Sequence, residues 1–143
     1  MSLPAAFRSR SLPLRLDIEL SRGVTFLLDR QILQRTTEAA TNQTITTPVN
    51  LTGVTSWSCL ITNTYEGTEL VAAVVTVVDA ANGRIRISID EGETDNITDP
   101  GGSDSIAVIG KIDVAAKDAN DVRLIFTGDV TLRRVTKVRT VWP

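Results

Sequence analysis

The chain has 143 residues, which is enough for one domain with a hydrophobic core. Hydrophobic residues make up 42% and charged residues 22%, as in ordinary globular proteins, and the 15 valines and 19 threonines favour strands. The formal net charge is −2, with both signs mixed and no basic block, so we expect no nucleic-acid partner. No segment approaches the roughly 18 consecutive apolar residues that a membrane span needs.

Residue types that commonly carry catalysis are scarce. There is no histidine, so neither a Ser-His-Asp nor a Cys-His site can be built from this chain. Cys59 is the only cysteine, and Met1–Arg10 has no apolar secretion signal, which favours synthesis in a reducing compartment. We expect no enzymatic activity, no cofactor, no required metal and no small-molecule substrate.

The first third of the chain predicts two strands and a loop. Residues 1–11 have no clear period and are expected to form an N-terminal arm. Alternating apolar residues predict a strand over 12–20 and a second strand over 24–28. Residues 35–47 are rich in Thr, Asn, Gln and Ala with weak period, which predicts a mobile surface loop and a possible contact element.

A hairpin at the centre of the chain is the clearest prediction. The Val-rich run 70–78 and the alternating run 84–90 flank Asn82-Gly83, a dipeptide that favours a tight turn. The isoleucines of the second run face one way and its arginines the other. Alternation over 56–62 predicts a strand with Trp57 on its apolar face.

The remaining segments follow the same pattern. One helical turn is expected over 93–97 within an acidic loop, followed by a strand over 106–114. Alternation over 122–127 predicts another strand, with a bulge at Gly128 and an end near Arg133.

These elements predict an all-β fold with seven or eight short strands. We expect an antiparallel two-sheet β-sandwich, immunoglobulin-like in the loose sense, with long loops and extended termini. A closed barrel is the alternative. The sandwich domain is expected to span residues 12–136, with a C-terminal tail over 137–143.

Carboxylates after the central hairpin raise two possibilities for chemistry. Asp95, Asp99 and Asp104 share a loop and could bind calcium, although their spacing matches no EF-hand, so a solvated acidic loop is favoured. Glu91, Glu93 and Asp95 could form a glycosidase pair, but they lie close together in one loop, and a charged surface loop is again favoured.

Three other features each have a plain structural interpretation. Trp57 could stack on a sugar, but its phase in the strand favours the core. Cys59 shares that face and is expected to be a small buried apolar residue. Three Asn-x-Thr sequences, starting at Asn42, Asn50 and Asn96, are chance matches if the chain is not secreted.

Both ends of the chain carry apolar or basic residues without an element to bury them. We expect them to be subunit-contact arms, ordered only in an assembly. The expected partner-contact residues are Leu3, Phe7, Arg8, Arg10, Val138, Val141 and Trp142. The alternative is that Trp142 folds back onto its own domain.

Several short motifs follow one another in a characteristic order: 17–26 (DIELSRGVTF), 48–55 (PVNLTGVT), 82–85 (NGRI), 110–114 (GKIDV) and 123–132 (RLIFTGDVTL). Their order and spacing over residues 14–136 resemble the N-terminal domain of upper baseplate proteins of tailed bacteriophages. Asn50 stands where the family usually has Asp, and the Tyr of its usual Tyr-Asp-Leu is missing before Asp113.

This resemblance implies a structural role in the virion. The chain is expected to be a small connector that joins a tail hub or baseplate ring to peripheral fibres, made in the host cytoplasm. Its partners would be other phage tail or baseplate proteins and copies of itself. The alternative function is a small carbohydrate-binding or host-adhesion module, which should show several exposed aromatic residues.

Overall fold

The computed structural model describes residues 3–4, 7, 13–63, 67–98 and 106–133, and strands make up 61% of them against 5% helix. The elements are β1 (Leu14–Arg15), β2 (Ile18–Ser21), β3 (Phe26–Gln31), β4 (Leu33–Thr37), β5 (Thr44–Pro48), β6 (Ser56–Asn63), β7 (Glu69–Ala72), β8 (Val74–Asp79), β9 (Arg84–Ile89), α1 (Glu91–Asp95), β10 (Ile106–Lys117) and β11 (Val122–Arg133). The all-β class is confirmed. No helix in the described part of the chain is long enough to cross a membrane.

Within the described residues the larger sheet has six strands in the order β1-β11-β10-β6-β7, with β2 also paired to β11. The long strands β10 and β11 form its centre and are antiparallel to each other, as are β10 and β6. Strands β1 and β2 run parallel to β11, which differs from the purely antiparallel expectation.

The single strand predicted over 12–20 is interrupted. β1 ends at Arg15 and β2 begins at Ile18, because the carbonyl of Leu16 lies against Gly128. A Cβ on Gly128 would overlap the Leu16 oxygen, so this close approach requires glycine.

The smaller sheet has the order β3-β9-β8 and contains the predicted central hairpin. Ile85, Ile87 and Ile89 are completely buried, while Arg84 and Arg86 are exposed, which confirms the predicted faces. The turn at Gly83 is also confirmed, with φ at +69°.

The Val-rich run before that turn is divided between two sheets. β7 pairs with β6 in the larger sheet, and β8 pairs with β9 in the smaller one. The division falls at Ala73, which belongs to neither strand. The prediction of one continuous strand over 70–78 is therefore wrong, because the chain crosses from one sheet to the other there.

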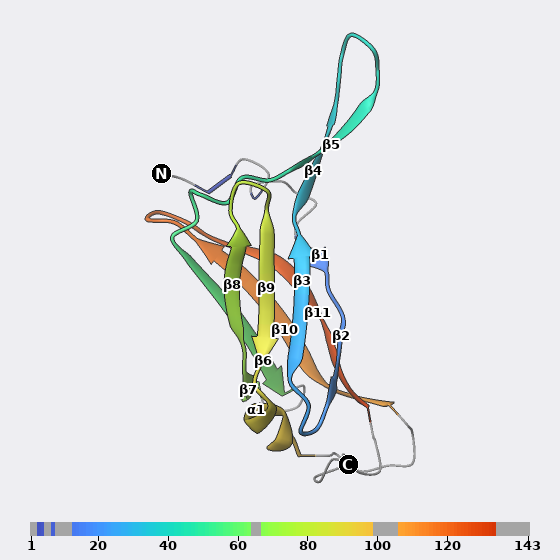
Figure 1. The fold of residues 1–143 in the computed structure, drawn as a ribbon, viewed down its shortest axis with the longest axis vertical. Coiled ribbons are helices and arrows are strands. Elements are labelled where there is room, and N and C mark those ends of the chain that lie inside the picture. The colour runs from blue at the N-terminus through green and yellow to red at the C-terminus, as the bar shows by residue number, and fades with distance from the viewer. Residues whose placement is uncertain (1–2, 5–6, 8–12, 64–66, 99–105, 134–143) are drawn as a thin grey trace, which may run out of the picture.

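The two sheets enclose the hydrophobic core. In Figure 1 the β3-β9-β8 sheet lies in front of β6, β10 and β11. Fully buried side chains come from both sheets and include Ile61, Ile85, Ile87, Ile89, Ile112, Val114, Ile125 and Val130. The core therefore lies between the sheets.

Helix α1 closes one end of the core and confirms the predicted helical turn, starting two residues earlier than expected. Its Thr94 is fully buried, and the Thr94 hydroxyl lies 2.9 Å from the carbonyl oxygen of Val24. This contact fixes the turn between β2 and β3 against α1.

The irregularity predicted at Gly128 occurs earlier in the strand. Val114 pairs with Phe126 and Ala115 pairs with Leu124, so Ile125 is the extra residue. This bulge buries Ile125 and Phe126 together and leaves Leu124 38% exposed.

We predict that Ile87→Ala destabilises the domain by about 2–5 kcal/mol, because it leaves a cavity in the core. Val74→Ala is the matched control in the neighbouring strand, since Val74 is 59% exposed, and it should change stability by less than about 1 kcal/mol. Urea unfolding measures both. Equal effects of the two substitutions would contradict the assigned faces of this sheet.

Candidate functional site

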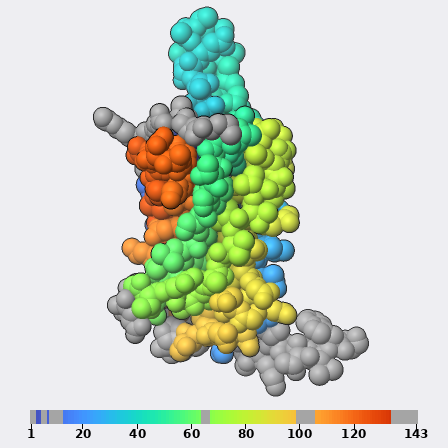
Figure 2. Space-filling model, turned by 90° about the vertical axis from the view of Figure 1, so that its left-hand side faces the viewer, coloured from blue at the N-terminus to red at the C-terminus, as the bar shows by residue number. Residues whose placement is uncertain are grey.

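A two-stranded hairpin, β4 and β5, projects from one end of the body (Figure 1) and forms the separate lobe at the top of Figure 2. The strands are paired from Leu33 opposite Pro48 to Thr37 opposite Thr44. From residue 33 to residue 48 every side chain except those of Gln34 and Thr47 is exposed. The loop predicted over 35–47 is therefore wrong, because most of this segment is paired strand.

The tip of the hairpin is closed by local hydrogen bonds. The backbone N–H of Glu38 donates to the carbonyl of Gln43 over 2.8 Å, and that of Asn42 donates to the carbonyl of Glu38 over 2.8 Å. Asn42 has φ at 55°, in the left-handed region that Asn tolerates better than most residues. Arg35 and Glu38 are the only charged residues in the hairpin.

The base of the hairpin is anchored in the core. Ile32, just before β4, and Val49, just after β5, are 3% and 2% exposed. The N–H of Ile32 donates to the carbonyl of Gly83 over 2.8 Å, and the N–H of Val49 donates to the carbonyl of Ile32 over 2.9 Å. The hairpin thus leaves the body from a hydrogen-bonded base.

Gly83 is the point where the β8–β9 turn meets this base. A Cβ on Gly83 would lie 2.6 Å from the carbonyl oxygen of Ile32 and 2.7 Å from that of Val49. Both are backbone atoms, and the Ile32 oxygen also accepts the N–H of Val49, so neither can move aside as the end of a flexible side chain could. The site therefore requires glycine for space as well as for its positive φ.

The segment after β5 adds a second anchor. Leu51 is 2% exposed, and its N–H donates to the carbonyl of Ala80 over 2.8 Å. The side-chain oxygen of Asn50 accepts the N–H of Thr52 over 3.0 Å, and the N–H of Val54 donates to Leu51. These bonds turn the chain back toward β6.

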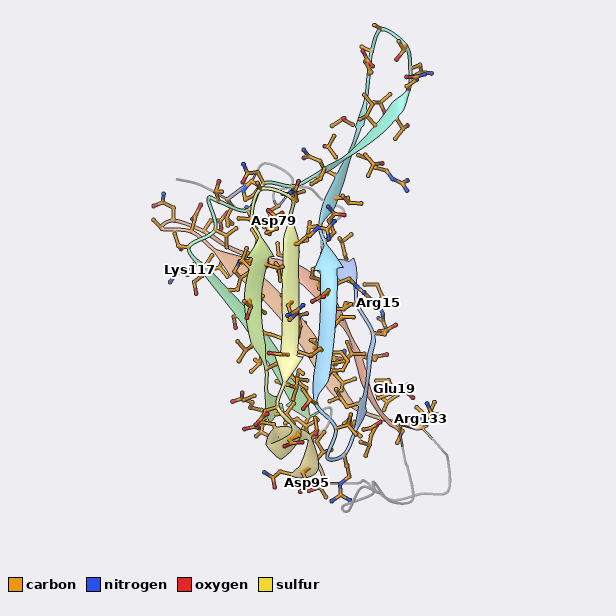
Figure 3. All side chains as sticks on the ribbon, in the orientation of Figure 1. Arg15, Glu19, Asp79, Asp95, Lys117 and Arg133 are labelled. Atoms are coloured by element: carbon orange, nitrogen blue, oxygen red, sulfur yellow. The ribbon has the colours of Figure 1, made fainter. Side chains whose placement is uncertain are left out.

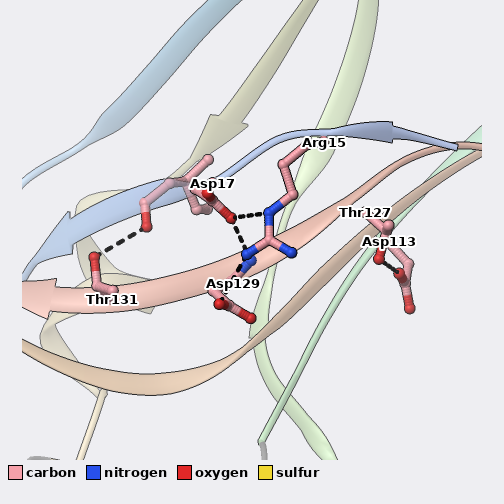
Figure 4. Close-up of polar contacts among 7 residues, drawn as sticks. Arg15, Asp17, Asp113, Thr127, Asp129 and Thr131 are labelled. Carbon is pink, nitrogen blue, oxygen red and sulfur yellow. Dashed lines mark hydrogen bonds and ion pairs between the residues drawn. The ribbon is translucent and has the colours of Figure 1, made fainter.

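A cluster of charges fixes β1 and β2 to β11 (Figure 4). Arg15 bonds Asp17 over 2.8 Å and Asp129 over 2.9 Å, and Asp17 also accepts the Asp129 N–H over 2.9 Å. The backbone N–H of Asp129, and secondly Arg15, lower the pKa of Asp17. These exposed groups bond one another. We therefore interpret them as holding β1 and β2 against β11 rather than as an acid–base pair.

The N-terminal residues in the described part of the chain belong to the body. Asp118 is 1% exposed, and its carboxylate accepts N–H groups of Leu3 over 2.7 Å, Asn120 over 2.7 Å and Asp121 over 2.6 Å. A buried carboxylate of this kind is stabilised by such donors. Leu3 is therefore tied to the turn between β10 and β11.

Leu3 and Phe7 are 3% and 1% exposed and lie in the core. The Phe7 ring meets Trp57 edge to face, with centroids 6.2 Å apart. Their assignment to an exposed contact arm is wrong, because their side chains are covered by their own domain. The other expected contact residues, Arg8, Arg10, Val138, Val141 and Trp142, lie outside the described residues.

The carboxylates considered for calcium or glycoside chemistry lie on α1 or outside the described residues. Asp99 and Asp104 are the two outside, and Asp95 is on α1, at the opposite end of the body from Asp79 and Lys117 (Figure 3). Glu93, also on α1, accepts the N–H of Ala72 over 3.1 Å. No group of three possible metal ligands occurs among the described residues.

Trp57 and Cys59 face inward as their strand phase predicted. Trp57 is half-buried and packs on the core, and Cys59 is 9% exposed. Burial, and secondly the charge of Asp113, raise the pKa of the Cys59 thiol to about 12. A thiol in this state is a poor nucleophile.

No protein-family model and no curated protein matches this sequence. Among the described residues, the projecting hairpin and its base are the strongest candidate site, because the hairpin exposes nearly all its side chains and leaves the body from a fixed base. Sequence analysis noted a possible contact element over 35–47, but only the alternation of Ile45 with its threonine neighbours could have suggested a strand there.

We predict that Gly83→Ala destabilises the domain by more than about 3 kcal/mol, because a clash with two backbone oxygens adds to the cost of positive φ. Gly67→Ala is the matched control, since Gly67 also has positive φ but no atom within 4 Å of an added Cβ, and it should cost only about 1–2 kcal/mol. Thermal and urea unfolding compare them. Similar losses would mean that Gly83 matters only for its φ.

We also predict that Cys59 reacts with a disulfide reagent at pH 8 at least ~100-fold more slowly in the folded protein than in urea. In the control, Ser58→Cys in a Cys59→Ser background places the thiol on the exposed neighbour, which should react at an ordinary rate. Rapid labelling of native Cys59 would contradict its burial.

Proposed function

We propose that this chain is a structural β-sandwich module, immunoglobulin-like in the loose sense, of a bacteriophage tail or baseplate. In this role it connects tail hub or baseplate proteins to peripheral fibres, and it resides in the virion. Its partners are other tail proteins and copies of itself, and it performs no catalysis.

The observation that carries the proposal is where the motifs shared with upper baseplate proteins lie in the fold. Residues 48–53 form the end of β5 and the base of the projecting hairpin, and Gly83 contacts that base. Gly23 makes the turn between β2 and β3 with φ at +73°, and Gly128 admits the Leu16 carbonyl. The motifs that carry the resemblance therefore include residues that shape the backbone. A chance match of short apolar motifs would not need to include such residues.

A connector also needs a part that extends beyond its own core. The β4–β5 hairpin buries almost none of its side chains against the body, whereas Ile32 and Val49 fix its base. Such a projection suits contact with a neighbouring subunit and is unnecessary for an isolated domain.

The carbohydrate-binding alternative is less well supported. Among the described residues no aromatic side chain is exposed: Phe7 and Phe126 are buried, and Phe26 and Trp57 are half-buried. A sugar platform needs an accessible aromatic face.

The direct test is the composition of phage particles purified from a lysate of cells that produce this protein. Quantitative mass spectrometry should find the chain in fixed ratio to tail proteins, and antibody labelling in electron micrographs should mark the tail or its tip. Absence from purified particles, or labelling of the capsid alone, would refute the proposal.

A further inference from the structure

Exposed sheet edges are templates for pairing with other chains, and proteins usually guard them with charges, bulges or covering segments. Three of the four edges of the body are guarded. The β1–β2 edge carries Arg15, Asp17 and Glu19, and the β3 edge carries Asp29 and Arg30.

The β7 edge is guarded in a different way. Glu69 places a charge on it, and the carboxylate of Glu93 on α1 takes the backbone N–H of Ala72. That bond occupies a donor that an incoming strand would need.

Strand β8 is the fourth edge, and its first five residues carry no charge. Val74, Val77 and Val78 are 59%, 39% and 53% exposed. Among the described residues β8 pairs only with β9, and this pairing is regular from Val74 to Val77, with a bulge at Val78 just before the charged Asp79. Its free side lies at the surface turned toward the viewer in Figure 2.

The projecting hairpin has an unguarded edge of its own. β5 reads Thr-Ile-Thr-Thr-Pro, without charge, and among the described residues pairs only with β4; Pro48, which has no N–H to donate, stands at its last position. Threonine and isoleucine favour extended backbone, and Thr44, Ile45 and Thr46 are all exposed. The paired strand β4 carries the hairpin's one cation, Arg35, so β5 is its less guarded edge.

We propose that β5 of one copy adds as a strand to the free edge of β8 in a second copy. One chain thus supplies both halves of the contact, an uncharged donor strand and an uncharged acceptor edge of similar length. The hairpin cannot serve its own β8, because it points away from the body beyond the end of that strand (Figure 1).

The contact is head-to-tail, so each copy offers one donor and one acceptor and the assembly closes as a ring or continues as a fibre. Backbone hydrogen bonds along Val74–Val77 supply most of its energy, with added cover for Val74. The inference depends on the two strands alone and stands apart from the proposed tail role.

Cross-linking between differently labelled copies tests the pairing. One variant of the full chain carries Thr46→Cys at the centre of β5, and the other carries Thr76→Cys at the centre of β8; both threonines are exposed. Cys59 does not compete, because it is buried and its thiol pKa is raised to about 12. A flexible bis-maleimide reaches between the two thiols in several registers of the strands.

The expected result is a covalent dimer when the two variants are mixed and none when either is treated alone. The matched control replaces the acceptor by Thr25→Cys, another exposed threonine, which lies between β2 and β3, and should give no dimer. A dimer from Thr46→Cys alone would indicate hairpin-to-hairpin pairing and overturn the proposal. Absence of a dimer from the mixture at the highest soluble concentration would also overturn it.

Discussion

The backbone of Gly83 lies against the carbonyl oxygens of Ile32 and Val49, and the projecting hairpin depends on that contact. The turn between β8 and β9 brings Gly83 there, so the smaller sheet and the hairpin share one anchor. Hydrogen bonds from Ile32 to Gly83 and from Val49 to Ile32 close the arrangement. An exposed ribbon with no core of its own thereby gains a fixed origin on a well-packed body.

Much of the fold could be predicted from side-chain period. The isoleucines of β9 alternate because one face is buried, and Asn82-Gly83 forms the turn that its φ preferences favour. Period cannot reveal which sheet a strand joins. The run 70–78 is apolar except for Thr76, so its side-chain pattern does not show the division at Ala73. An alternating sequence also does not show whether a strand pairs in parallel, as β2 does with β11.

The hairpin escaped prediction for the opposite reason. Alternation of apolar and polar residues marks a strand only when one face is buried, and nearly every side chain from β4 through β5 is exposed to solvent. The threonines of the hairpin suit either face of a strand, so its sequence shows little alternation. The position of Leu3 was also hidden, because its N–H donates to Asp118, which lies 115 residues away in the chain.

An ordered hairpin over residues that resemble a loop is the claim on which the functional account depends. Nuclear magnetic resonance of the full chain tests it directly. The account predicts strand-like chemical shifts in β4 and β5 and cross-strand proton contacts between Arg35 and Thr46 and between Thr36 and Ile45, which are paired in the structure. Random-coil shifts throughout 35–47, with no cross-strand contact, would contradict it.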